Sequence, residues 1–258
     1  MYEQWLQIAR EAAAAAAEVI EHYYCREMSI ETKADESPVT AADREAERVI
    51  HDIIAKACPA HAFFGEETGH SGDASAEFRW LVDPIDGTKS FIRRQPFFST
   101  QIALLHHGEV VVGVSSAAVF GEQAWAVRGG GAFLDGERVN VSDVDTLAAA
   151  SLSSGNIASL ARDSAAWARY GKLLGEVNRI RGYGDFYHYH LLARGALDIV
   201  IESDLNILDV AALSLIVEEA GGRFTTLAGG KLNDGTRSVL ASNHHLHDTV
   251  RGLVQWRE

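Results

Sequence analysis

The sequence has little cysteine and no long apolar run. Only two cysteines occur among its 258 residues, Cys25 and Cys58, and neither belongs to a Cys-x-x-Cys pair or to a Cys/His ligand spacing. This argues against a disulfide scaffold and a structural zinc site, and we expect two reduced thiols in a cytoplasmic protein. No segment has the length of a transmembrane helix. Charges are spread through residues 1–24, which is not typical of a signal peptide.

Positive charge is also scarce. The chain has 23 Lys and Arg against 36 Asp and Glu, a formal net charge of −13, and no run rich in Lys or Arg. Such a surface repels phosphodiester backbones and anionic lipid headgroups. We therefore expect neither nucleic acid nor a membrane surface as a partner. The apolar fraction of 47% and the charged fraction of 23% are ordinary for a globular protein.

Hydrophobic periodicity predicts two halves. Residues 2–24 form an Ala-rich helix pattern, and alternating strands with a turn at His107-Gly108 follow a second amphipathic helix. Later in the chain, helix and strand patterns alternate, and no internal repeat is present. We expect an α+β half over 1–144 and an α/β half over 145–258, packed as stacked helix and sheet layers.

Carboxylates occur where several separate strands or turns end. The apolar strand in "LVDPIDGT" ends in Asp83 and Asp86, three residues apart, and "AFFGEE" places Glu66 after another strand. Asp209 opens a helix pattern, and Asp43 follows a turn. Each of them alone is explained by a helix cap or a turn, so only their combination points to a shared site.

Together these side chains predict a site for a hard divalent cation. Clustered carboxylates repel one another without a cation between them, and Mg²⁺ takes oxygen ligands while keeping positions for phosphate and water. Gly87-Thr88 opens a segment whose backbone N–H groups could bind phosphate at a helix N-terminus. Phosphatases that form an aspartyl phosphate need two aspartates two residues apart, so the three-residue spacing of Asp83 and Asp86 favours a metal-activated water.

These motifs resemble one known family. "GEE" (65–67), "DPIDGT" (83–88) and "DVAALSLIVEEAGG" (209–222) are similar to motifs of the inositol monophosphatase family of Mg²⁺-dependent, lithium-sensitive phosphatases. The resemblance extends to "SPVTAAD" (37–43) and to the Ala-rich first helix. It implies an α/β (α+β) fold, a layered α/β/α/β/α sandwich that is usually a homodimer. It also implies that the first half carries most of the metal ligands.

The resemblance also implies the metal ligands. A first Mg²⁺ would be held by Glu66, Asp83 and the carbonyl of Ile85, and a second by Asp83, Asp86 and Asp209. A third, weaker Mg²⁺ beside Glu66 would position the attacking water. The cofactor is thus two to three Mg²⁺ per site.

The remaining catalytic groups follow from the same resemblance. Thr88 paired with Asp43 would help to deprotonate the water, and the N–H groups of Gly87 and Thr88 would bind phosphate oxygens. The family usually has Trp before the last metal-binding Asp, where this chain has Leu208. We expect altered packing there and retained chemistry. We also consider closure of a loop near residues 33–43 over the site.

The substrate is predicted from "GTKSF" and "GYGDFYHY" (182–189), which look most like the histidinol-phosphate phosphatase branch. L-Histidinol phosphate carries an ammonium and an imidazole, so we expect Asp185 and Glu202 to face its leaving group. Glu202 also matches a Glu of inositol phosphatases and does not discriminate between them. Asp185 could instead cap a helix.

Several alternatives stay open. The substrate could be inositol 1-phosphate or a 3′(2′),5′-bisphosphate nucleotide, or the specificity could be broad. A non-catalytic metal- or phosphate-binding regulator is a further alternative. It is disfavoured because all of the acidic residues and the threonine of the pattern are present: Asp43, Glu66, Asp83, Asp86, Thr88 and Asp209.

Overall fold

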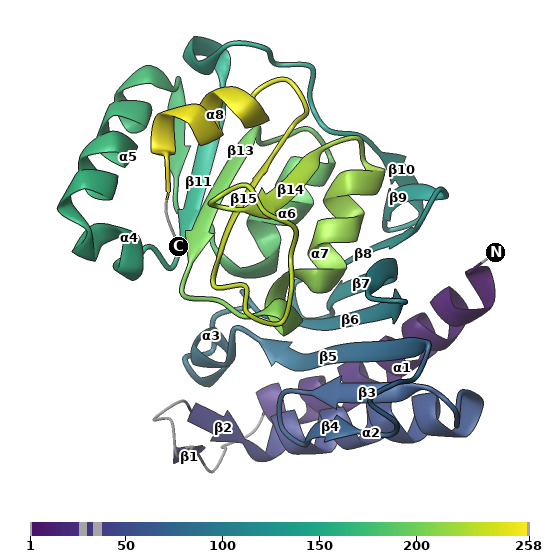
Figure 1. Cartoon of the computed structure of the whole chain (residues 1–258). Coiled ribbons are helices and arrows are strands. Elements are labelled where there is room, and N and C mark those ends of the chain that lie inside the picture. Colours follow the sequence, from purple (N-terminus) through teal and green to yellow (C-terminus); the bar gives the residue numbers. More distant parts are fainter. Residues whose placement is uncertain (1, 26–29, 33–37, 257–258) are drawn as a thin grey trace.

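A computed structural model describes residues 2–25, 30–32 and 38–256. Two β-sheets alternate with three layers of helices (Figure 1). The helices are α1 (Glu3–Tyr24), α2 (Ala41–Ala57), α3 (Thr88–Ile92), α4 (Ala158–Arg162), α5 (Ser164–Glu176), α6 (Asp185–Ala193), α7 (Ile207–Glu219) and α8 (His247–Val254), with a 3₁₀ turn at Leu147–Ala149.

The first sheet has eight strands in the order β10-β9-β8-β7-β6-β5-β3-β4. All neighbouring strands are antiparallel except β3 and β5, which run parallel. The strands are β3 (Ala62–Gly65), β4 (Gly69–Ser71), β5 (Phe78–Asp86), β6 (Ser99–His106), β7 (Glu109–Ala117), β8 (Glu122–Val127), β9 (Gly131–Leu134) and β10 (Glu137–Val139).

The second sheet has five strands in the order β12-β11-β13-β15-β14, with β11 parallel to both of its neighbours. Its strands are β11 (Ser151–Gly155), β12 (Arg179–Arg181), β13 (Ile199–Ser203), β14 (Arg223–Thr226) and β15 (Ser238–Ser242). A separate two-stranded ladder joins β1 (Ile30–Thr32) and β2 (Pro38–Thr40).

Alanines explain the outer helix layer. The side chains of Ala9, Ala12, Ala13 and Ala16 are fully buried on α1, so the Ala-rich run packs closely on its neighbours. The helix α1 packs against α2 and against β7 of the first sheet, and Figure 1 shows both helices on the outer face of that sheet. Small side chains with high helix propensity suit this close packing.

The helix α7 lies between the two sheets with α6 (Figure 1). It is apolar on all sides because it contacts β6 and β7 on one face and β14 and β15 on the other. A side chain at Gly113 of β7 would place its Cβ 2.6 Å from the carbonyl oxygen of Ala212. Glycine at this position therefore lets α7 lie directly on the first sheet, which positions the first turn of α7 beside the end of β5.

The layered α/β/α/β/α architecture expected from the sequence is confirmed. The hairpin between β6 and β7 turns at His107 and Gly108, which both have positive φ. The last helix, α8, begins at His247 after a turn and ends before Gln255, whose φ is 44°. The division at residue 144 stays a prediction, and residues 33–37 of the loop near 33–43 lie outside the described residues.

The two cysteines are both free, Cys25 exposed and Cys58 buried. In the described part of the chain, no helix combines the length and apolar character that crossing a membrane requires. The cytoplasmic location stays a prediction.

The buried His247 gives the fold an expected pH dependence. Its Nδ1 lies 3.0 Å from Ser242 Oγ and its Nε2 lies 3.0 Å from Thr225 Oγ1. Burial, with the charge of Arg223 as the next cause, lowers the pKa of His247 from 6.5 to about 4.

The unfolded chain binds this proton more readily than the folded protein does. The contribution of neutral His247 to the free energy of unfolding is therefore fully present above pH 6.5 and is lost as the pH falls towards 4. We expect wild type to lose about 2 kcal/mol more than His247→Gln between pH 7.5 and pH 5, from this shift alone. Urea unfolding at both pH values measures the difference. Equal losses in the two proteins would show that His247 does not cause it.

Candidate active site

A β-bulge brings Asp83 and Asp86 to the same site. Along a regular strand, residues three apart point to opposite faces. Here Asp83 pairs with Gln101 and Asp86 pairs with Ser99. Between these two pairs, β5 therefore contains one residue more than β6, which is a β-bulge. The extra residue turns both carboxylates towards one point at the end of β5. The sequence predicted the two ligands but not the bulge that unites them.

The bulge is held by hydrogen bonds within the strand pair. Thr100 Oγ1 donates to the carbonyl oxygen of Pro84 at 2.8 Å. The backbone N–H of Ile85 donates to Asp83 Oδ1 at 3.0 Å. These bonds fix both the turn of the backbone and the orientation of the first carboxylate.

The third carboxylate, Asp209, comes from the first turn of α7. The side chain of Asn206 caps this helix by accepting from the N–H of Leu208 at 2.7 Å, and Asp209 Oδ2 accepts from the N–H of Asn206 at 2.8 Å. The alternative that Asp209 is itself the N-cap is therefore wrong; it is the reciprocal member of a capping box. Leu208 is buried in an apolar cluster with Leu81, consistent with a packing role.

These three carboxylates form a cluster that could hold a metal. One oxygen from each of Asp83, Asp86 and Asp209 lies within 4.8 Å of the others. Glu66 follows β3, and its N–H donates to the carbonyl oxygen of Val82 on the parallel strand β5 at 3.1 Å. Glu66 is thereby placed beside Asp83, whose carboxyl interacts with it.

The loop that carries Glu66 is held by Glu47, which the sequence analysis missed. The fully buried carboxylate of Glu47 accepts from the N–H groups of Glu67 and Thr68, each at 2.8 Å, and from Thr68 Oγ1 at 2.6 Å. A Cβ at Gly65 would lie 2.4 Å from the Glu47 carboxyl carbon. The sequence could have indicated Glu47 through its spacing from Asp43. The two residues are one helical turn apart on α2 and therefore lie on the same face of the helix.

We expect Glu47→Gln to weaken metal binding without changing any group in the cavity. An amide has one acceptor oxygen and turns its NH₂ towards N–H donors, so at least one buried hydrogen bond is lost, at a cost of about 1–3 kcal/mol. The Mg²⁺ concentration for half-maximal activity should rise, and the urea midpoint should fall. Glu45→Gln on the same helix is the control. Unchanged values for Glu47→Gln would exclude the positioning role.

Thr88 begins the short helix α3 and connects the cavity to Asp43. Its Oγ1 lies 3.4 Å from Asp43 Oδ1 and 3.1 Å from the carbonyl oxygen of Ile85. Gly87 precedes it with φ 95°, and a Cβ there would lie 2.7 Å from the carbonyl oxygen of Phe97. Only glycine fits this sharp turn from β5 into α3.

A cavity of 580 Å³ joins these groups. It contains most of the residues expected from the sequence, and also a set that the sequence analysis did not identify. The expected residues that line it are Glu66, Asp83, Ile85, Asp86, Gly87, Thr88, Asp185 and Asp209. The residues that were missed are Lys89, Ser90, Asn156, Ala158, Arg162, Asp204 and Asn206.

Two expected residues lie behind the cavity wall. Asp43 is 1% exposed and is reached through Thr88. Glu202 is 3% exposed and lines a small inner recess together with Asp86, Asp185 and Asp209. Asp43 and Glu202 therefore do not line the 580 Å³ cavity themselves but lie one layer of residues behind its wall.

The Glu202 carboxylate is held by a helix. Tyr189 donates its hydroxyl proton to Glu202 Oε2 at 2.8 Å, and His188 Nε2 lies 3.1 Å from the same oxygen. Asp185 is the first residue of α6, while the N-cap position belongs to Gly184. The alternative that Asp185 caps this helix is therefore wrong. The buried His188 and Tyr189 of α6 therefore orient Glu202.

Negative charge is concentrated in this cavity. Burial raises the pKa of Asp83 well above its usual range, and the charges of Glu66, Asp86 and Asp209 raise it further. Burial likewise raises the pKa of Asp86, and the pKa of Asp209 to about 7. Burial and then the charge of Glu202 raise the pKa of Asp185 to about 6.

The arrangement fits a hard divalent cation. The clustered donors are carboxylate oxygens, without thiolate or imidazole, which suits Mg²⁺, Mn²⁺ or Ca²⁺. A cation between the carboxylates would remove the repulsion that raises their pKa values.

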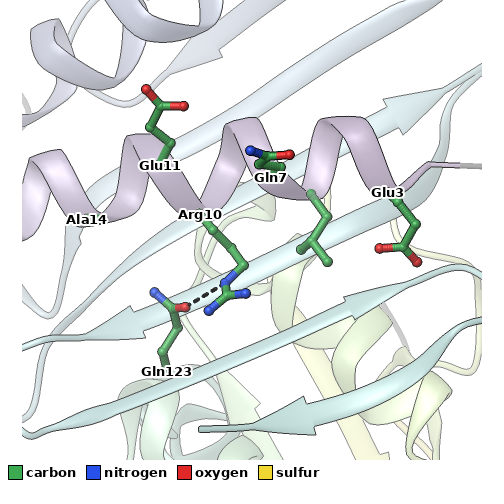
Figure 2. A pocket seen from close by; sticks show the side chains of 7 residues that line it. Glu3, Gln7, Arg10, Glu11, Ala14 and Gln123 are labelled. Atoms are coloured by element: carbon green, nitrogen blue, oxygen red, sulfur yellow. Dashed lines mark hydrogen bonds between the residues drawn. The ribbon is translucent and has the colours of Figure 1, made fainter. Parts of the chain in front are cut away.

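A wider hollow of 720 Å³ lies on α1 and has a different character. Figure 2 shows Arg10 extending from the helix towards Gln123, to whose Oε1 it donates at 3.0 Å. Its lining mixes side chains of both charges and brings no carboxylates together as a metal cluster in the described residues. The chemistry therefore belongs to the cavity at the end of β5. The hollow is lined by Glu3, Leu6, Gln7, Arg10, Glu11, Ala14 and Gln123.

Comparison with known proteins identifies the family of the chain. The model of the inositol monophosphatase family matches residues 1–256. A histidinol-phosphatase of Streptomyces coelicolor is 37% identical over 261 residues, covering 95% of this chain and 94% of the relative. A histidinol-phosphatase of Mycobacterium tuberculosis is 42% identical over 229 residues, covering 87% of each.

Solved structures show the same fold. The extragenic suppressor protein SuhB of Bartonella henselae has a TM-score of 0.89 at 29% identity, covering 98% of each chain. An inositol monophosphatase of Thermotoga maritima has a TM-score of 0.85 at 30% identity, covering 98% of this chain and 97% of that one. The chain belongs to the inositol monophosphatase family and is a phosphatase, a phosphoric monoester hydrolase.

Proposed function

We propose that this phosphatase hydrolyses L-histidinol phosphate to L-histidinol and phosphate with Mg²⁺, in histidine biosynthesis. The observation that carries the proposal is the acidic recess beside the metal cluster, where Asp185 and Glu202 adjoin Asp86 and Asp209. Two carboxylates next to the site of bond cleavage suit a leaving group with an ammonium and an imidazole. The names of the relatives from Streptomyces and Mycobacterium support the same substrate.

The proposed ligands are those at the end of β5 and the start of α7. Glu66, Asp83 and the Ile85 carbonyl would hold a first Mg²⁺, and Asp83, Asp86 and Asp209 a second, with a third beside Glu66. Bound Mg²⁺ supplies a water of lowered pKa and positive charge that stabilises the leaving alkoxide. The clustering of the three aspartates within 4.8 Å supports this set.

Thr88 and Asp43 would remove the proton of the attacking water. The Thr88 hydroxyl donates towards Asp43 Oδ1 at 3.4 Å, so Thr88 Oγ1 can take a proton from water while Asp43 receives the hydroxyl proton. The N–H groups of Gly87 and Thr88 at the start of α3 would bind phosphate oxygens. Both residues line the cavity, which supports this assignment.

The substrate cation would be recognised by Asp185 at the cavity wall, with Glu202 behind it. Tyr189 and His188 fix the Glu202 carboxylate, so its charge is presented in one orientation. A fixed anion loses little conformational entropy when a cation binds.

The test is phosphate release in Mg²⁺ from L-histidinol phosphate, inositol 1-phosphate and adenosine 3′,5′-bisphosphate, compared by kcat/KM. We expect a preference for histidinol phosphate of about a hundredfold or more, which equals about 2.7 kcal/mol of transition-state discrimination. Comparable rates on all three would replace the specific function with a broad one. A preference for either other ester would reassign the substrate.

We also propose that the chain forms a homodimer. Trp167 on α5 and Ile180 on β12 are large apolar side chains that are 43% and 40% exposed, and association of two chains would remove such surface from water. The strand β12 is the edge of the second sheet. Light scattering coupled to gel filtration should give twice the 28.0 kDa mass of the chain. A single-chain mass at micromolar concentration would contradict the dimer.

A further inference from the structure

A second cluster of metal-ligating side chains lies at the other end of β5. Glu77 precedes the first residue of this strand, His106 ends β6, and His107 forms the turn into β7. His106 Nε2 lies 2.6 Å from Glu77 Oε1, and His107 Nε2 lies 3.5 Å from the same oxygen. One ligand atom from each residue lies within 4.8 Å of the other two.

The backbone explains why two consecutive histidines face one carboxylate. Neighbouring residues of a regular strand point to opposite faces. His107 instead has φ 50°, and its N–H donates to the carbonyl oxygen of Glu77 at 2.9 Å. The two imidazole rings consequently stack, with centroids 4.5 Å apart and planes 28° apart.

The ring of His106 is held before any ligand binds. It stacks on Phe78 with centroids 4.4 Å apart and planes 8° apart. Its Nδ1 lies 3.0 Å from the hydroxyl of Tyr2. Metal-binding histidines use one ring nitrogen as ligand and the other to donate to an outer partner. His106 has this arrangement, with Tyr2 as the outer partner and Nε2 directed at the cluster.

We propose that Glu77, His106 and His107 bind one Zn²⁺. Zn²⁺ takes both imidazole nitrogens and carboxylate oxygens, whereas Mg²⁺ takes oxygen ligands, so the two imidazoles favour Zn²⁺. In a tetrahedral site with metal–ligand distances near 2.05 Å, ligand atoms lie about 3.3 Å apart. The 3.5 Å separation of His107 Nε2 and Glu77 Oε1 already matches this value. Glu77 is 54% exposed, so its carboxylate can move outward from His106 to admit the ion.

The zinc site is separate from the phosphatase site. Asp83 lies six positions after Glu77 along an extended strand, a distance of about 20 Å. Three protein ligands leave the fourth position to water. The ion would join the start of β5 to the β6–β7 hairpin. Through His106 it would also be linked to Tyr2, the residue before α1. Its expected effect is therefore on the stability of the first sheet and not on turnover.

The test is a Zn²⁺ titration against a colorimetric chelator with Mg²⁺ in large excess. We expect one Zn²⁺ bound with a matching rise in melting temperature. Removal of an outer partner alone can weaken metal binding about tenfold. Because His107 is a proposed ligand, His107→Ala should weaken Zn²⁺ binding by more than that. Tyr2→Phe removes only an outer partner and should weaken it by about tenfold. Phosphate release in Mg²⁺ alone should be unchanged in His107→Ala.

Two further variants separate this site from other places that could take Zn²⁺. Asp83→Asn should retain the Zn²⁺ that His107→Ala loses, since it alters only the carboxylate cluster. His245→Ala is the matched control, because it removes one histidine from another adjacent pair, whose rings lie 3.8 Å apart. Zn²⁺ binding by His107→Ala and Glu77→Gln equal to that of wild type would overturn the proposal. A loss in His245→Ala of the same size would overturn it as well.

Discussion

Asp83→Asn is expected to lower kcat/KM by more than about a thousandfold. Removal of one group that stabilises transition-state charge typically costs a hundredfold to a thousandfold, and Asp83 would serve two metal ions at once. Burial and then the charges of Glu66, Asp86 and Asp209 raise the pKa of its carboxyl, which places it among the other carboxylates. Phosphate release over a range of Mg²⁺ concentrations measures the effect, and high Mg²⁺ should not restore the rate.

The same variant should keep its fold. Asn has the shape of Asp without its charge, and it removes one charge from a group that repels its neighbours. The melting temperature in the presence of a chelator should therefore equal or exceed that of wild type. Asp52→Asn, on the exposed side of α2, is the control and should retain full activity. Wild-type turnover by Asp83→Asn would show that the metal assignment is wrong.

Asp185→Asn is expected to raise KM for L-histidinol phosphate by about tenfold to a hundredfold. Hydrogen bonds to a charged partner contribute about 1.5–3 kcal/mol, which corresponds to this range of affinity. A generic aryl phosphate has no cation in its leaving group, so its KM should change less than about threefold. The measurement is the ratio of the two KM values in wild type and variant.

The matched control for this prediction is Asp204→Asn. Asp204 also lines the cavity, but its carboxylate accepts from the N–H of Ser159 at 3.0 Å and from the hydroxyl of Ser203 at 3.0 Å. Asp204→Asn should therefore change KM by the same factor for L-histidinol phosphate and for the aryl phosphate. Equal changes for both substrates in Asp185→Asn would remove Asp185 from the recognition site.

The sequence was most informative where local chemistry determines structure. The Ala-rich run predicts α1, and His107-Gly108 predicts the hairpin, because both depend on residues close in the chain. The aspartates at the end of β5 predicted a carboxylate cluster because strand ends and helix starts lie close together in the fold. The structure confirms that Asp83, Asp86 and Asp209 lie together.

What depends on contacts between distant segments was not predictable. The bulge between Asp83 and Asp86 is visible only in the pairing with β6. Glu47 looks like an exposed helical residue until Gly65 and Thr68 are placed over its carboxylate. Glu202 was expected to face the leaving group, and only the structure shows that it does so from a recess behind the wall of the larger cavity, where a hydrogen bond from Tyr189 of α6 holds it.

The proposed ligand set can be located directly in crystals of the wild-type protein grown with Mn²⁺, a cation that favours the same carboxylate ligands as Mg²⁺. We expect anomalous density between the carboxylates of Asp83, Asp86 and Asp209, with a second peak towards Glu66. The peaks should be absent in Asp83→Asn. Density confined to other parts of the molecule, or no change between wild type and variant, would contradict the assignment of these residues as the metal site.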